Sequence, residues 1–391
     1  MRIAIVYDCL YPHTIGGAER WYRSLAERLA QRHQVTYVTR RQWTSATPPN
    51  PPAGVRVVAV SGGTQLYTTS GRRRIMPPLR FGAGVLTHLL RHRGEYDVVH
   101  TCAFPYFPLL AAQLAAARGG PPVVVDWLET WSDQYWRTYL GGARGRIGAG
   151  VQRLCIRLTQ HACVLSNLQA ARLAESGYRG ELLLLRGLYA EPIARPQSET
   201  SRESLVVYAG RHIPEKRVAA IPAAIAAARR HIPELRATIF GDGPDRARVL
   251  AEIERLGLGE VVHCPGFVPS EEVDAALCRA LCLLLPSERE GYGLVVVEAA
   301  ARGTPSIVVR APDNAAAELV EHQENGWVAV GAAPQALAAA IEAVHAAGPA
   351  LAQRTRAWFT KNAPRLMLDT TVSQLEALYG TIAGASSGAK R

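Results

Sequence analysis

Short apolar segments that alternate with helical segments place the strongest constraint on the fold of this chain. In its first half, β-branched or apolar runs, typical of buried strands, recur between stretches with helical periodicity. The expected strands are residues 2–6, 35–38, 57–60, 97–100, 123–126, 163–166 and 182–185. Because strands and helices alternate, we expect a parallel sheet that is covered by helices on both faces.

A polar segment separates this series from a second one. Residues 191–204, with the sequence EPIARPQSETSRES, contain two prolines and no apolar period, so they predict a linker between domains. The strands expected beyond it are residues 205–209, 237–240, 261–264, 281–285 and 306–309. The length of 391 residues also fits two domains of ordinary size.

The chain is therefore expected to form an α/β fold of two Rossmann-like domains that face each other across a cleft. We place the first domain at residues 1–190 and the second at residues 205–357. Residues 358–382 predict a helix that packs back on the first domain, and residues 383–391 predict a disordered tail. Ligands of such sheets bind outside the carboxyl ends of the strands, so the functional residues should lie in the loops at those ends.

The amino-acid composition indicates what kind of partner the chain binds and in which cellular compartment it folds. Lys and Arg number 44 against 33 Asp and Glu, and the net charge of +11 favours an anionic partner, although an ordinary solvated basic surface would give the same balance. The seven cysteines have no CxxC or zinc-type spacing, and the chain begins directly with a strand pattern. We therefore expect a cytoplasmic protein without a signal peptide. No apolar run reaches the roughly 18 residues of a membrane span, so any membrane contact should be peripheral.

The strongest motif is Glu-Gly-Tyr-Gly-Leu-Val-Val-Val-Glu, which begins at Glu290 and ends at Glu298. Glu290 follows a strand, and Glu298 lies on the next helix, about 12 Å away at a rise of about 1.5 Å per residue. That separation is comparable with a sugar diphosphate plus a ribose. Gly293 and the amides of Leu294 and Val295 form a helix N-terminus that can hold phosphate. The alternative is a pair of solvated glutamates with no ligand.

Basic and glycine-rich loops follow other strands of the second series. Arg211 and Lys216 come after residues 205–209, where two cations can clamp a diphosphate, unless they belong to an ordinary basic loop. Gly241 and Gly243 close the next strand, where Gly241 is expected to help bind the nucleotide sugar, unless both are plain turn residues. In the first half, Gly16 and Gly17 open a long helix, where they either let a backbone approach an anion or simply begin the helix.

Together and in this order, these elements resemble glycosyltransferase family 4, a retaining GT-B family, over nearly the whole chain. The Glu-x7-Glu element, the Gly-Arg…Lys element at Gly210 to Lys216, the Pro-Gly-Phe loop at residues 265–267 and the Glu-Asn-Gly element at residues 324–326 match family positions. The resemblance implies transfer of a sugar from a nucleotide diphosphate sugar, linked to UDP or GDP, to a hydroxyl acceptor. It implies no other cofactor.

The resemblance also implies roles for individual residues. Arg211 and Lys216 would hold the diphosphate, Glu290 would contact hydroxyls of the donor sugar, and Glu298 would bind the ribose. Phe267 and Val268 would contact the base. Gly16 and Gly17 would lie near the donor phosphate and the acceptor. No Asp-x-Asp pair follows a strand, so no metal is required.

One departure from the family concerns the acceptor side. Family members commonly carry a histidine after the strand that matches residues 123–126, where this chain reads Asp-Trp-Leu-Glu-Thr-Trp from Asp126. We expect Asp126 or Glu129 to take the acceptor-facing role, with His100 as a further candidate, unless the acceptor needs no such base.

Two stretches, residues 72–93 and 144–157, mix arginines with leucines and other apolar residues. They predict contact with an anionic membrane or an anionic acceptor, or else ordinary amphipathic helices that pack on the sheet. The acceptor would be a glycan, a lipid-linked sugar or a small molecule. An epimerase-type enzyme that binds the same donors is the alternative, whereas nucleic-acid binding lacks the expected basic-aromatic strands and helix-turn-helix.

Overall fold

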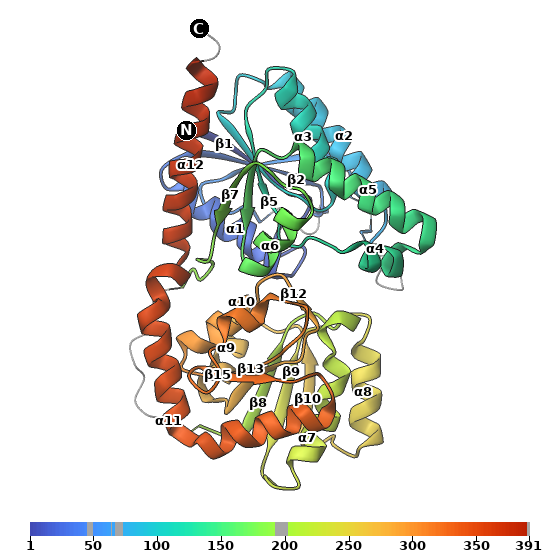
Figure 1. The fold of residues 1–391 in the computed structure, drawn as a ribbon, viewed down its shortest axis with the longest axis vertical. Helices are drawn as coiled ribbons and strands as arrows, with labels where there is room; N and C mark the ends of the chain where they lie inside the picture. The colour runs from blue at the N-terminus through green and yellow to red at the C-terminus, as the bar shows by residue number, and fades with distance from the viewer. Residues whose placement is uncertain (45–49, 64, 67–72, 192–201, 389–391) are drawn as a thin grey trace. The chain divides into compact units, whose positions relative to one another are not determined.

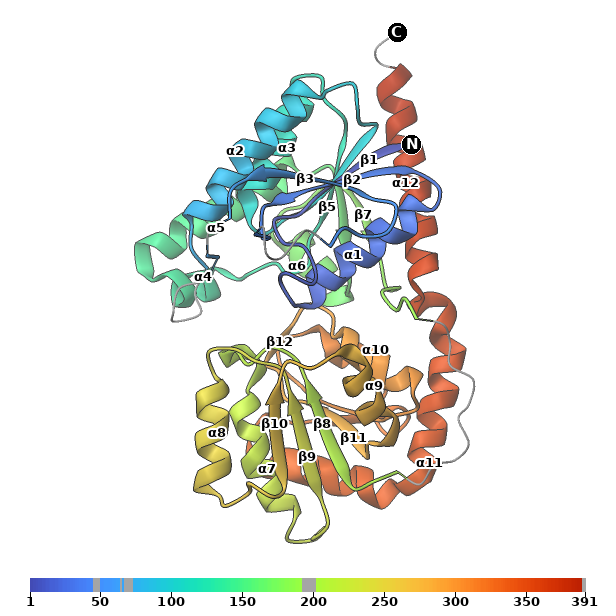
Figure 2. The same ribbon diagram turned by 180° about the vertical axis from the view of Figure 1, so that it is seen from behind.

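The computed structural model describes residues 1–44, 50–63, 65–66, 73–191 and 202–388, and it divides into two compact units. The first unit contains the segment from Met1 to Ala190 and the C-terminal segment that begins at Met367. The second unit runs from Glu191 to Leu366. Each unit is a parallel sheet flanked by helices (Figures 1 and 2). The predicted α/β class with two Rossmann-like units is therefore confirmed.

The first unit contains a seven-stranded parallel sheet in the order β3-β2-β1-β4-β5-β6-β7. Its strands are β1 (Arg2–Val6), β2 (Gln34–Arg40), β3 (Arg56–Ser61), β4 (Val98–Cys102), β5 (Val123–Asp126), β6 (His161–Val164) and β7 (Glu181–Leu184). Its helices are α1 (Gly17–Ala30), α2 (Met76–Arg91), α3 (Tyr106–Ala117), α4 (Asp133–Leu140), α5 (Gly142–Leu158) and α6 (Asn167–Glu175). The strand order reverses between β1 and β4, which is where sheets of this kind bind ligands.

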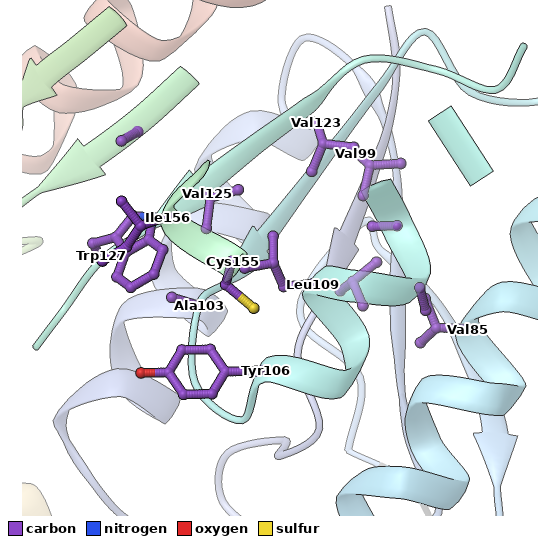
Figure 3. Close-up of a cluster of buried hydrophobic side chains, with 14 of the residues drawn as sticks. Val85, Val99, Ala103, Tyr106, Leu109, Val123, Val125, Trp127, Cys155 and Ile156 are labelled. Carbon is purple, nitrogen blue, oxygen red and sulfur yellow. The ribbon is translucent and has the colours of Figure 1, made fainter. Parts of the chain in front are cut away.

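The core of the first unit lies between the sheet and helices α2, α3 and α5 (Figure 3). Val99 and Val125 of the sheet, Val85 of α2, Leu109 of α3 and Cys155 of α5 are all fully buried there. Burial of each aliphatic side chain of this size is worth about 1.5–3 kcal/mol, so this face of α5 is held firmly against the sheet.

The second unit contains a six-stranded parallel sheet in the order β10-β9-β8-β11-β13-β15. Its strands are β8 (Leu205–Ala209), β9 (Arg236–Phe240), β10 (Val262–Gly266), β11 (Cys282–Leu285), β13 (Ser306–Val309) and β15 (Gly326–Ala329). The helices and 3₁₀ turns are η1 (Pro214–Lys216), η2 (Val218–Ala220), α7 (Ile221–Ala228), α8 (Arg246–Arg255), α9 (Ser270–Arg279), α10 (Leu294–Ala301) and η3 (Ala315–Leu319). Two short strands, β12 (Arg289–Glu290) and β14 (Asp313–Asn314), pair in parallel outside this sheet. The sequence patterns did not predict β12, β14 or β15.

The C-terminal region differs from the helix expected at residues 358–382. Helix α11 (Pro334–Leu366) contains a non-helical residue at Gly348, before Pro349, and ends in the second unit. Helix α12 (Leu368–Gly388) then belongs to the first unit. It continues through residues 383–388, which were expected to be a disordered tail, whereas residues 389–391 lie outside the described residues. Most of the expected linker, residues 192–201, also lies outside them.

Polar contacts fasten α12 to the first unit. Thr371 Oγ1 accepts a hydrogen bond from the amide of Gly187 at 3.1 Å, and Arg28 forms an ion pair with Asp369 at 2.7 Å. Tyr379 is fully buried, and its hydroxyl forms a hydrogen bond with Nδ1 of His100. These contacts explain why the last helix returns to the sheet with which the chain began.

We expect Tyr379→Phe to destabilise the first unit. The substitution leaves Nδ1 of buried His100 without its partner, which should cost about 1–3 kcal/mol, whereas Thr381→Ala on the exposed side of α12 should change stability by less than about 0.5 kcal/mol. Urea unfolding followed by far-UV circular dichroism will compare the two variants. Equal midpoints for Tyr379→Phe and Thr381→Ala would show that the hydroxyl does not fasten the helix.

Candidate functional site

The loops at the carboxyl ends of β8, β9 and β10 are packed directly against one another. The amide of Gly241 donates to the carbonyl of Gly266 at 2.8 Å, and the amide of Gly210 donates to the carbonyl of Phe240 at 3.2 Å. At Gly241 the backbone has φ +113°, and a Cβ atom would lie 1.9 Å from the carbonyl oxygen of Gly210. Gly241 is therefore required by backbone packing, which is a reason the sequence alone did not provide.

His212 ties the loop that contains Arg211 to the neighbouring loop. Its amide donates to the carbonyl of Asp242 and its carbonyl accepts from the amide of Asp245, both at 2.9 Å. The imidazole is fully buried, and burial lowers its pKa, so the ring stays neutral near neutral pH. Arg211 itself is half-buried at the carboxyl edge of the sheet.

Lys216 and Glu290 form an ion pair that brings two of the predicted site residues together. Nζ of Lys216 lies 2.5 Å from Oε1 of Glu290 and donates to the carbonyl of Arg289 at 3.2 Å. The hydroxyl of Ser287 donates to the same Oε1 at 3.1 Å. The two ionic side chains remain 19% and 13% exposed, so a ligand can reach the pair.

The hydrogen bonds of this pair leave two groups for a ligand. An ammonium has three N–H donors, and Lys216 uses two of them, on Glu290 and on the carbonyl of Arg289. Oε1 of Glu290 receives both Lys216 and Ser287, whereas Oε2 has no hydrogen-bond partner among the residues that the structure describes. The pair therefore presents one donor and one anionic acceptor side by side.

Helix α10 begins directly after this loop. Gly293 precedes it with φ +96°, and a Cβ there would lie 2.7 Å from the side chain of Ala316. No side chain caps the first turn, which contains Leu294 and Val295, so their amides are available to an anion. Glu298 lies one turn further on and is 9% exposed.

Phe267 projects from the loop after β10 and is half exposed, which is unusual for a large apolar ring. It follows Gly266, whose carbonyl receives the amide of Gly241, so the ring stands beside the packed loops. Val268 is half-buried next to it. An exposed aromatic ring at this edge offers a surface on which a planar base can stack.

In the first unit, Gly16 precedes α1 and Gly17 is its first residue. A Cβ at Gly16 would lie 2.3 Å from Oε2 of Glu19, whereas no atom lies within 4 Å of a Cβ at Gly17. Glu19 is buried in the first turn, where a carboxylate is stabilised by the helix dipole. Gly16 therefore makes room for a side chain of its own helix, and the open side of Gly17 remains available.

Asp126 and His100 do not face outward as expected. Asp126 is fully buried, and its Oδ2 accepts hydrogen bonds from Trp21 Nε1 at 2.9 Å and from the Tyr22 hydroxyl at 2.8 Å. Its Oδ1 lies 2.8 Å from Nε2 of His100, whose other nitrogen is bonded to Tyr379. Burial, reinforced by the Asp126 carboxylate, raises the pKa of Tyr22, which keeps its hydroxyl a donor. Both residues are thus enclosed in the interior and cannot contact an acceptor in this arrangement.

Other groups lie at the carboxyl edge of the first sheet. Glu129 is half-buried, and its Oε2 accepts from Trp131 Nε1 at 2.9 Å. Asp8, which follows β1, is buried and pairs with Arg73, whose guanidinium lies 5.4 Å from the centre of the Phe104 ring. Asp8 and Arg73 lie far apart in the chain, so sequence patterns do not predict their ion pair. Of the acceptor-side candidates, Glu129 stays accessible.

Two family descriptions match the chain, one for each unit. "Glycosyl transferase 4-like domain" matches residues 16–186, and "Glycosyl transferases group 1" matches residues 191–365. Glycogen synthase of Mycobacterium tuberculosis is 27% identical over 90% of this chain and 88% of its own length. Other curated relatives are 32–40% identical over shorter stretches, and the chain covers only 20–27% of their length.

Solved structures share the fold over nearly the whole chain. Sucrose-phosphate synthase from Thermosynechococcus elongatus has a TM-score of 0.79 at 20% identity, covering 98% of this chain and 99% of that one. HepE from Anabaena, solved in complex with UDP, has a TM-score of 0.73 at 18% identity, covering 97% and 100%. The two family matches, which follow each other along the chain and together span both units, place this protein among the GT-B glycosyltransferases of the family 4 type.

Proposed function

We propose that this protein transfers a sugar from a nucleotide diphosphate sugar to a hydroxyl acceptor with retention of the anomeric configuration. The observation that carries the proposal is the ion pair of Lys216 and Glu290, which lies beside the uncapped N-terminus of α10. Cationic and amide donors there suit a diphosphate, and the neighbouring carboxylate suits the hydroxyls of a sugar.

In the proposed reaction, the bond between the anomeric carbon and the diphosphate breaks, and charge builds on the leaving diphosphate. Arg211, the third N–H of Lys216 and the first amides of α10 would stabilise that charge. The acceptor oxygen bonds to the anomeric carbon on the same face, and its proton passes to the departing phosphate oxygen. Oε2 of Glu290 accepts a hydrogen bond from a donor-sugar hydroxyl, and no protein nucleophile is needed.

For the donor, we propose a UDP- or GDP-linked sugar, with the base stacked on Phe267 and the ribose near Glu298. HepE has been solved in complex with UDP and with UDP-glucose, which makes UDP the first nucleotide to test. A thermal-shift panel of UDP, GDP, ADP and TDP is the direct experiment, because a ligand at about 100 times its dissociation constant stabilises by about 2.7 kcal/mol. No shift with any of them would refute the proposed donor site.

For the acceptor, we propose a lipid-linked sugar or a growing glycan at an anionic membrane surface. The outer face of α5 supports this proposal, because Ile147, Leu154 and Leu158 lie on one side of the helix and are 67%, 48% and 40% exposed. The exposed arginines of the same helix are Arg144, Arg146, Arg153 and Arg157. Apolar side chains flanked by arginines match the interface of an anionic leaflet.

The start of α2 extends the same kind of surface. Ile75, Met76 and Leu79 are exposed there. The amide of Arg73 donates to the hydroxyl of Tyr139 on α4, and α4 packs on α5, so the three helices lie together within the first unit. Helices α2, α3 and α5 are seen side by side in Figures 1 and 2. Arg72 lies outside the described residues.

None of the helices formed by the described residues has the length and apolar character of a membrane span. The proposed contact is therefore peripheral. Near an anionic leaflet each arginine contributes about 1 kcal/mol, so the four arginines of α5 suffice for reversible binding.

Arg211→Ala and Lys216→Ala should each lower kcat/KM for the donor by roughly 10- to 150-fold. This range corresponds to loss of a charge-assisted hydrogen bond worth about 1.5–3 kcal/mol. Lys216→Ala also leaves Glu290 without its cation, so it should have the larger effect. Arg255→Ala on exposed α8 is the control of equal charge change. Wild-type rates in both clamp variants would remove these residues from the donor site.

Substitutions of Glu290 and Glu298 should affect different kinetic constants. Glu298→Ala should mainly raise the donor KM, because ribose contacts are alike in the ground and transition states. Glu290→Ala should mainly lower kcat, because its free oxygen faces the reacting sugar in the proposed arrangement. Steady-state kinetics with the donor identified by thermal shift will decide, and a larger kcat loss in Glu298→Ala would reverse the two roles.

Ile147→Ser and Leu154→Ser should weaken binding to anionic vesicles. Leu250→Ser, which changes a 39% exposed leucine of α8 in the other unit, should not. Co-sedimentation with phosphatidylserine-containing and neutral phosphatidylcholine vesicles will measure this, and binding should disappear at 1 M salt, where the Debye length is about 3 Å. Equal, negligible binding to both vesicles would favour a soluble acceptor instead.

A further inference from the structure

The loop that carries Glu290 is fastened by buried residues that the proposed reaction does not use directly. Ser287 is fully buried between β11 and β12, yet its hydroxyl reaches Oε1 of Glu290 at 3.1 Å. Because Lys216 approaches the same oxygen, two donors converge on one side of the carboxylate. A carboxylate held at one oxygen by two donors from different elements cannot rotate without breaking both contacts.

Asn314 fixes the backbone on which Ser287 lies. Its amide nitrogen donates to the carbonyls of Ser287 at 3.0 Å and of Val309 at 2.8 Å, and its Oδ1 accepts from the amide of Ala316 at 3.1 Å. The side chain is 3% exposed, so all three bonds are shielded from water. Asn314 therefore joins three segments: the loop before Glu290, the end of β13 and the start of η3.

A second set of contacts closes the same junction. Glu290 pairs with Asn314, and Arg289 with Asp313, as register partners in the two short parallel strands β12 and β14. The guanidinium of Arg289 also forms an ion pair with Asp313 at 2.5 Å, with only 9% of the arginine side chain exposed. The backbone at Glu290 is thus held by strand pairing with β14. It is also held by the hydrogen bond from the side chain of Asn314 to the carbonyl of Ser287.

We propose that Ser287 and Asn314 are positioning residues, which turn Oε1 of Glu290 toward Lys216 and leave Oε2 directed at the donor sugar. This inference rests on the proposed function, since it assigns a purpose to the orientation of Glu290. It extends that function to two residues with no part in binding the nucleotide. Loss of either side chain should lower kcat, because the hydrogen bond between a hydroxyl of the reacting sugar and Glu290 depends on the orientation of the carboxylate.

The kinetic signature follows from where the contacts lie. UDP has a ribose and a diphosphate but lacks the transferred sugar, so its affinity depends on Arg211, Lys216 and the N-terminus of α10 and not on the free oxygen of Glu290. Ser287→Ala should therefore lower kcat roughly ten- to hundredfold, as expected for a misplaced contact to the reacting group, while the Kd for UDP changes by less than about twofold. A general loss of folding would instead lower kcat and weaken UDP binding together.

Asn314→Asp offers a second test at almost unchanged volume. The substitution replaces the amide donors with a carboxylate oxygen that faces the carbonyls of Ser287 and Val309, which repels both. It should lower kcat at least as much as Ser287→Ala. Ser306→Ala is the matched control, since Ser306 is a buried serine of the same unit whose hydroxyl has no hydrogen-bond partner among the described residues.

The experiment uses the full chain and needs no known acceptor. Calorimetry gives the Kd for UDP and GDP, and slow hydrolysis of UDP-glucose or a GDP-sugar, with water in place of the acceptor, gives kcat. A wild-type protein that binds neither nucleotide would refute the proposed function itself. If the wild type binds and turns over donor, then a kcat in Ser287→Ala equal to that of Ser306→Ala, or a parallel loss of UDP affinity, would overturn the positioning role.

Discussion

Parallel strand pairing is the constraint on which the candidate site depends. In the second unit it brings the carboxyl ends of β8, β9, β10 and β11 to one edge, so that loops containing Arg211, Gly241, Phe267 and Glu290 become neighbours although they are far apart in sequence. The close approach of Gly241 to the carbonyl of Gly210 shows how tightly these loops are packed. A side chain at this position would separate the loops and, with them, the groups that the proposed donor site requires.

At that edge of the sheet, the charges of Lys216 and Glu290 balance each other before a ligand binds. Lys216 neutralises Glu290, which lowers the cost of holding a carboxylate in a partly buried loop. The same contact orients both groups and still leaves one N–H and one carboxylate oxygen for a ligand. A site arranged in this way needs little reorganisation when the donor binds, which is the condition for electrostatic stabilisation of a leaving group.

The first unit uses its buried polar groups differently. Asp126 ends β5, where a catalytic residue was expected, and His100 lies within β4, but Trp21, Tyr22 and Tyr379 enclose them. The hydrogen bonds of Asp126 fasten α1 to the sheet and that of His100 fastens α12, so their role in the structure is stability. Of the expected acceptor-side residues, Glu129 remains accessible, and the outer side of α5 presents an apolar and basic face.

The amino-acid sequence by itself determined the two α/β units, the position of nearly every strand of the two sheets and the loops that carry Arg211, Lys216 and Glu290, because apolar periodicity and motif spacing are local properties. It predicted that a C-terminal helix returns to the first unit, but not that this helix begins at Leu368, nor the short strands β12 and β14 or the enclosure of Asp126. Each of these depends on contacts between residues distant in sequence. Only tertiary packing decides which carboxylate is buried with partners and which keeps an oxygen free for a ligand.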